Sequence, residues 1–178
     1  KNGVMYVFKE KTIDFSWETE QLRRQVELAT SCYAGVRGDD ADSGESLILS
    51  SDEKVLFGRL LSEAMRALYA YFIKMAAVDE RSFAVDELSD GGVKICGFSV
   101  ERKRRVRTLS PERIAMVDRC ASEFVVCHIT AAWFEMSVQP EGAALFADRL
   151  KRAQTMLLRS LAYLCEYSYS KSYTVIDR

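Results

Sequence analysis

Residues 110–137, SPERIAMVDRCASEFVVCHITAAWFEMS, carry the clearest helix signal in the sequence. Ser110 suits the capping position before a helix, Pro111 suits its first turn, and Glu112 interacts favourably with the helix dipole. The residues that follow at helical spacing form one broad, mostly apolar face. They are Ile114, Val117, Ala121, Phe124, Val125, His128, Ala132 and Met136. We therefore expect a long central helix that packs against other elements.

The segment that follows predicts a second long helix, folded back on the first. Residues 137–142, SVQPEG, interrupt the helical pattern, and Pro140 suits the first turn of a new helix that ends near residue 167. Because the break is short, we expect the two helices to lie antiparallel, as a helical hairpin over 110–167. Small residues on the second helix would permit a close approach: Ala143, Ala147 and Ala153.

Two further helices are predicted upstream. Ser16 can cap a helix over 17–34, with Gly35 as its stop. Residues 50–53, SSDE, form a capping box for a helix over 50–78, whose wide apolar stripe indicates neighbours on more than one side. The residues expected in the core are Val55, Leu60, Ala64, Leu68, Phe72, Ile114, Val117, Phe124, Leu150, Leu157 and Leu161.

Short strands are predicted between the helices. Residues 4–15, VMYVFKEKTIDF, begin with the alternation of a strand. Two more alternating runs flank the turn SDGG, whose glycines supply the positive φ angles that a hairpin needs, so we expect a β-hairpin over 82–100. Gly97 inside the second run predicts a bulge. With the N-terminal strand, the hairpin could form a three-stranded antiparallel sheet.

The predicted fold class is α+β and mainly α: a helical bundle of about four helices with a small antiparallel β-hairpin or sheet. A chain of 178 residues suits one domain, 1–178. Its expected parts are an N-terminal strand and helix (1–34), an acidic loop (35–49), a helix (50–78), a β-hairpin (82–100), a helical hairpin (110–167) and a tail (168–178). The tail fits a final strand, a docking arm or a disordered end.

Composition is ordinary for a soluble globular domain, and we expect the protein to be cytoplasmic. With a net charge of −1, nothing global indicates nucleic acid, so any such contact must come from a local patch. No apolar run is long enough to span a bilayer, and membrane contact is not expected. Residues 1–13 alternate apolar and charged side chains and do not resemble a signal peptide.

The cysteines favour free thiols over a disulfide framework. They are odd in number, irregularly spaced and without a CxxC pair. Four of them sit among apolar residues, so we expect buried thiols in a reducing compartment. The five are Cys32, Cys96, Cys120, Cys127 and Cys165.

The one sharp charge cluster is a basic run in residues 101–108, ERKRRVRT. Its five cations fall in six positions and could contact phosphates or an acidic partner. In an extended segment, however, alternate residues face opposite sides, and no aromatic residue interleaves as in single-strand grooves. A solvated face or intersubunit salt bridges are the alternative. The candidate contact residues are Arg102, Lys103, Arg104, Arg105 and Arg107.

The acidic segment 35–46, GVRGDDADSGES, suggests a cation site by its residue types. Its spacing departs from an EF-hand loop that starts at Asp40, because Gly44 falls one place early and no Glu stands at the twelfth position. We expect a solvated loop, and cation binding stays open.

His128, the only histidine, is the obvious candidate for chemistry, together with Cys120 and Cys127. The two cysteines would lie roughly 10.5 Å apart along a helix axis, too far to share one zinc ion. His128 follows Cys127 directly and points about 100° away, so the two cannot act as a nucleophile pair. Glu123 is not at the Glu-x-x-His spacing of carboxylate di-metal centres. We therefore expect no catalytic, metal or cofactor site, and a buried, hydrogen-bonded His128.

Two helical segments resemble small phage head–tail connector (adaptor) proteins. Residues 51–71, SDEKVLFGRLLSEAMRALYAY, resemble the acidic start and the opening helix of those proteins. Residues 114–164 resemble the part that follows, in which a helix with alanines and aromatics leads through a short break into a helix like 146–160. The likeness covers about half of the chain, rests on pattern rather than on a signature motif, and leaves the strands unexplained.

The resemblance implies a non-enzymatic structural protein of the virion, a subunit of a homo-oligomeric ring between portal and tail. Other virion proteins would then be its partners. The alternative is a helical protein-interaction or regulatory module of unknown partner. An enzyme with an unrecognised site is the third possibility.

Overall fold

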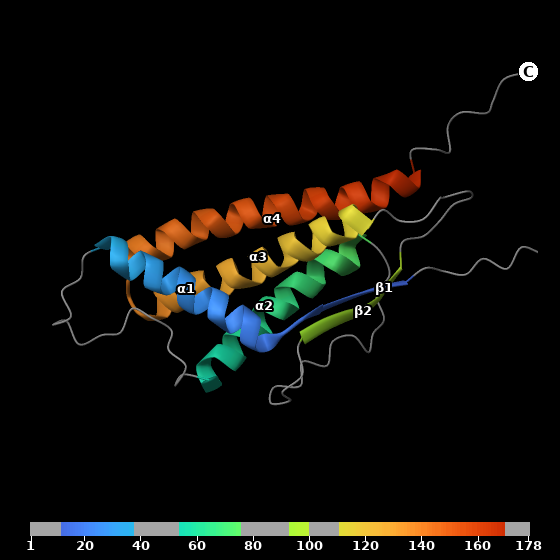
Figure 1. Ribbon diagram of the computed structural model, residues 1–178. Coiled ribbons are helices and arrows are strands. Elements are labelled where there is room, and N and C mark those ends of the chain that lie inside the picture. The colour runs from blue at the N-terminus through green and yellow to red at the C-terminus, as the bar shows by residue number, and fades with distance from the viewer. Residues whose placement is uncertain (1–11, 38–53, 76–92, 100–110, 170–178) are drawn as a thin grey trace, which may run out of the picture.

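The computed structural model describes residues 12–37, 54–75, 93–99 and 111–169. The fold is mainly helical with a minor β element, as the sequence predicts (Figure 1). In chain order the elements are β1 (Thr12–Trp17), α1 (Thr19–Arg37), α2 (Lys54–Met75), β2 (Val93–Ser99), α3 (Pro111–Met136) and α4 (Pro140–Tyr169). None of these described helices is both long and apolar enough to cross a membrane.

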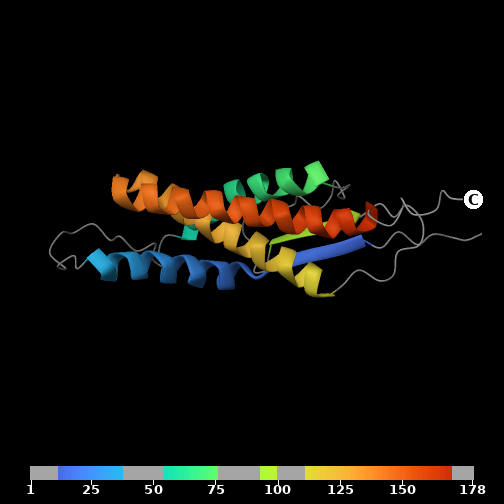
Figure 2. The same ribbon diagram turned by 90° about the horizontal axis from the view of Figure 1, so that it is seen from above.

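Helix α3 is the centre of the structure. It packs along α4 over most of its length and also contacts α1 and α2. Seen from above, α1 and α2 lie on opposite sides of the α3–α4 pair (Figure 2). Because α3 has neighbours on several sides, its buried residues extend beyond the single predicted face and include Ile129, Trp133 and Phe134. The predicted helical hairpin is confirmed, with its break at 137–139.

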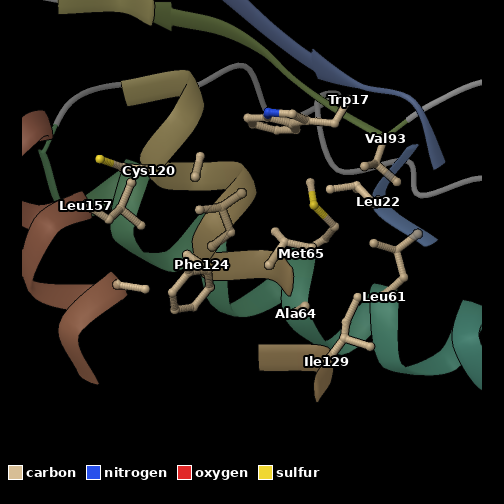
Figure 3. Packing of buried hydrophobic residues seen from close by; sticks show 14 of the residues in the cluster. Trp17, Leu22, Leu61, Ala64, Met65, Val93, Cys120, Phe124, Ile129 and Leu157 are labelled. Atoms are coloured by element: carbon tan, nitrogen blue, oxygen red, sulfur yellow. The ribbon is translucent and has the colours of Figure 1, made fainter. Parts of the chain in front are cut away.

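Most of the predicted core is buried. Figure 3 shows Phe124 of α3 among side chains that include Met65 of α2 and Leu157 of α4. The confirmed residues are Leu60, Ala64, Leu68, Phe72, Val117, Phe124, Leu157 and Leu161. Ile114 and Leu150 are half-buried and pack against this cluster.

The prediction for Val55 is wrong, because this side chain is 90% exposed. At about 100° per residue, Val55 lies roughly 200° around the helix from Phe57, which is buried. The spacing of apolar residues alone places Val55 in the wide apolar stripe of α2. Its neighbours Leu56 and Phe57 contact the core instead.

The two strands pair with each other. β1 and β2 are antiparallel, from Thr12 opposite Ser99 to Trp17 opposite Val93. The register shifts where Ile13 faces Phe98 and Phe15 faces Ile95, which leaves an extra residue on β2. Gly97 lies in that interval, at the predicted bulge. The first strand of the predicted hairpin, within 82–92, and residues 4–11 lie outside the described residues.

The predicted start of the first helix is wrong. Ser16 and Trp17 belong to β1, where buried Ile13, Phe15 and Trp17 alternate with exposed Asp14 and Ser16. The helix begins at Thr19, and the amide of Leu22 donates to the carbonyl of Glu18 at 3.1 Å. Strand alternation that continues through Trp17 places three large side chains in the core, and this outweighs the capping preference of serine.

Two other predicted boundaries change. α1 continues through Gly35 to Arg37, since one glycine costs a helix only about 1 kcal/mol. The rest of the acidic loop, 38–49, and the capping box lie outside the described residues. α4 extends to Tyr169, into the segment assigned to the tail.

Candidate interaction surfaces

The basic run is not part of the described structure. Residues 102–107, like the acidic segment 38–46, lie outside the described ranges. Contact of the five cations with phosphates or an acidic partner therefore stays a prediction. The candidate surfaces below come from the described helices.

His128 is half-buried on α3, beside the ring of Phe124 at a centroid distance of 5.7 Å. Its Nδ1 is buried and has no hydrogen-bond partner in the described part of the chain, so the predicted hydrogen bond is missing at this atom. The pKa of His128 is lowered because burial disfavours the charged imidazolium, and the carboxylates of Glu63 and Glu135 oppose that shift in part.

The cysteines differ in exposure. Cys120 is buried, Cys127 is half-buried and Cys32 is exposed, so the expectation of buried thiols is right for Cys120 and wrong for Cys32. Burial, aided by the charge of Glu123, raises the pKa of Cys127 to about 11, which keeps the thiol protonated and weakly nucleophilic near neutral pH. Among the described residues, no group of three or more potential ligands could hold a metal ion.

A carboxyl group that sequence reasoning did not single out lies beside β1. Asp118 of α3 is partly buried, and burial raises its pKa, while the indole of Trp17 lowers it by a smaller amount. The two groups are therefore close, although Nε1 of Trp17 makes no hydrogen bond of standard length within the described residues. The pair lies where the end of β1 meets α3.

Arg113 and Tyr163 join the open end of the α3–α4 hairpin. The guanidinium of Arg113 lies 3.8 Å from the centroid of the Tyr163 ring. Its Nη2 donates to the tyrosine hydroxyl at 2.9 Å, and its Nη1 donates to the Tyr163 carbonyl at 3.4 Å. This combination of stacking and hydrogen bonds fixes the start of α3 against α4.

The turn between α3 and α4 holds an unusual residue. Val138 has a φ of 54°, in the left-handed region, and its side chain is 84% exposed. The amide of Gln139 donates to the carbonyl of Phe134 at 3.1 Å, and the amide of Val138 donates to that of Glu135 at 3.3 Å. These two bonds form a Schellman motif, in which glycine normally takes the position held here by valine.

Sequence reasoning located this break but not its strained residue. Pro140 and Gly142 marked the turn, yet Gly142 lies inside α4, where it faces the ring of Phe134. A valine carries no sequence signal for a positive φ, so only the backbone reveals Val138. Met136, one residue before the turn, is 53% exposed and adds to the apolar surface at this end.

Comparison with family models, with curated protein sequences and with solved structures gives no match. The resemblance to head–tail connector proteins therefore stays a prediction, carried by residues 51–71 and 114–164 alone.

Proposed function

We propose that this chain is a non-enzymatic structural protein that acts by contact with other protein chains. The observation that carries the proposal is Val138, which combines a left-handed backbone with a side chain that is 84% exposed. Left-handed backbone costs roughly 1–2 kcal/mol for a residue other than glycine, and a β-branched side chain is the least suited to it. Strain of this kind collects where it serves a function.

Folding gives no reason to keep a valine at this position. The exposed side chain gains little from burial within the chain, and glycine would relieve the strain. Contact with a partner would explain both features, because the isopropyl group then becomes buried in the complex. The α3–α4 hairpin beneath it, joined by Arg113 and Tyr163 at its far end, would position the turn for that contact.

The mass of the protein in solution, measured by sedimentation over a range of concentrations, tests this proposal in its homo-oligomeric form. We expect the wild-type chain to self-associate and Val138→Gly to shift the distribution toward the monomer. Val55→Ala is the matched control, because Val55 is 90% exposed in α2 with an ordinary backbone. Equal association of wild type and Val138→Gly would remove the turn from the interface.

The specific form that we propose is a ring subunit of the head–tail connector type, found in the cytoplasm and then in the virion. Its support is the resemblance, together with the observed order of helix, short break and helix in α3 and α4. A ring needs two different complementary surfaces on each subunit. A chain that stays strictly monomeric at high concentration would contradict the ring.

The alternative is a helical interaction or regulatory module with a different chain as its partner, and the exposed apolar residues Leu145, Met156 and Tyr163 on the outer side of α4 favour it. The basic run at 102–107 would add a contact with phosphates or an acidic partner, and that contact should weaken with added salt. An enzyme with an unrecognised site is the third candidate, and a metal or ligand bound beside His128 would favour it.

A further inference from the structure

Six residues form a straight row along the solvent side of α4, which we call the α4 row. Successive members are four, three, four, three and four residues apart, which is the spacing of the a and d positions in a coiled coil. Over its length of about 27 Å, apolar residues and arginines share the row. Its members are Leu145, Arg149, Arg152, Met156, Arg159 and Tyr163.

All six side chains are exposed. Leu145 and Met156 are each 43% exposed, and Tyr163 is 51% exposed although the Arg113 guanidinium stacks on its ring, which is high for large apolar groups. Each member of the row directly precedes a residue that is buried or half-buried against the rest of the bundle. The row therefore lies directly beside the packed face of α4, on the side that is exposed to solvent.

The arginines are available for a partner. Arg149 stacks on the ring of Phe146 at 4.9 Å, which pre-orients its guanidinium. Arg152 and Arg159 make no ion pair within the part of the chain that the structure describes, whereas the neighbouring Lys151 pairs with Asp148 at 3.7 Å. The arginine stems can cover apolar surface while their charged groups stay free to bind.

A second copy of α4 does not suit this row. Parallel pairing in register would place each arginine opposite its own copy. Antiparallel pairing about the middle of the row would place Arg149 opposite Arg159 of the other copy. Like charges at core positions oppose association, so the row disfavours a symmetric α4–α4 dimer.

Charge complementarity instead indicates a different helix. We propose that the α4 row docks a helix of another protein that presents carboxylates opposite the three arginines and apolar side chains opposite Leu145, Met156 and Tyr163. This proposal goes beyond the contact at Val138 and does not depend on it. Charged pairs of this type contribute to affinity and above all to the choice of partner and register.

Two other anionic partners fit less well. Phosphates of a nucleic acid would gain little from Leu145, which lies at one end of the row, or from Met156, which interrupts the line of arginines. A membrane-surface helix needs a wide apolar face for the lipid, and the wide face of α4 is already packed on α3. The combination of arginines and apolar groups at coiled-coil spacing is the feature that a helix would recognise.

The test uses labelled synthetic helical peptides of about 21 residues, three heptads, and fluorescence anisotropy with the full chain. In one peptide the a and d positions read Leu, Glu, Glu, Leu, Glu, Leu, and in a second peptide this order is reversed, to cover both orientations. We expect one of the two to bind and Arg152→Glu to weaken its binding about tenfold. A peptide with lysine opposite position 152 should recover that loss.

Arg66→Glu is the matched control, because Arg66 is an exposed arginine on a different helix, α2. If Arg152→Glu lowers the melting temperature, Arg159→Glu takes its place. Failure of both acidic peptides to bind overturns the proposal, as does an equal loss with Arg66→Glu. Tighter, arginine-dependent binding of a single-stranded oligonucleotide or of anionic vesicles would assign the row to phosphates instead. Self-association that Arg152→Glu abolishes would make a second copy the occupant.

Discussion

Gly142 in the first turn of α4 lies against the ring of Phe134 near the end of α3. A Cβ atom at Gly142 would come within 2.7 Å of Cδ1 of Phe134 and 2.9 Å of its Cγ. The ring has little freedom to move, because Phe134 is fully buried and contacts the rings of Phe146 and Tyr33 at centroid distances of 5.2 Å and 4.7 Å. Only glycine allows the two helices to approach this closely at the turn.

Gly142→Ala should therefore destabilise the protein, by about 1–3 kcal/mol, the usual range for overpacking a core. Thermal unfolding measures the change. Gly58→Ala in α2 is the control, since a Cβ there meets nothing within 4 Å, and helix propensity predicts a gain of up to about 1 kcal/mol. A Gly142→Ala variant as stable as the wild type would mean that Phe134 can move aside.

Phe124→Ala should cost about 3–5 kcal/mol, because it leaves a cavity at the centre of the bundle. Phe124 is fully buried and meets the ring of Tyr71 edge to face at 5.5 Å. Chemical denaturation gives the free energy of unfolding directly. A loss below about 1 kcal/mol would contradict the packing of α2 on α3 described above.

His128 should make the protein less stable in mild acid. Its pKa in the folded state lies below the ordinary value of 6.5, so below that pH the unfolded chain binds the proton more readily. Stability from this group is present above pH 6.5 and is lost as the pH falls toward the lower, folded-state pKa. His128→Gln should remove this component of the pH dependence. If wild type and His128→Gln lose stability equally between neutral and mildly acidic pH, His128 does not contribute to the pH dependence.

The three described cysteine side chains should react at different rates. Cys32 is exposed, whereas Cys120 is buried and Cys127 carries a raised pKa of about 11. Brief alkylation of the native protein near neutral pH, followed by peptide mass mapping, should label Cys32 before the other two. Labelling of Cys127 as fast as Cys32 would contradict the burial of its thiol.

Sequence reasoning succeeded where burial follows a regular period over several turns. The sequence predicts Phe72, Val117 and Leu157 in the core because each continues the apolar spacing of a long amphipathic helix, and all three are buried. Sequence reasoning failed at the ends of helices and strands, where one residue fits two patterns. Ser16 could cap a helix or stand on the exposed side of a strand, and the burial of Trp17 decided for the strand.

The candidate contact surfaces were harder to predict. Nothing in the identity of Val138 signals a left-handed backbone, which comes from closing α3 onto α4. In the α4 row, Leu145 and Tyr163 resemble core residues when read by type, and their exposure follows only from where α4 lies on α3. The basic run at 102–107 is visible at once in the sequence, but its contact with phosphates or an acidic partner stays a prediction.

The most direct test of the central claim compares stability and association in the same two proteins, wild type and Val138→Gly. We predict opposite signs: relief of about 1 kcal/mol of strain should raise the melting temperature of the variant by about 2–4 °C, while sedimentation shows weaker association. A variant that is more stable and associates as strongly as the wild type would contradict the claim that Val138 is kept for contact with another chain.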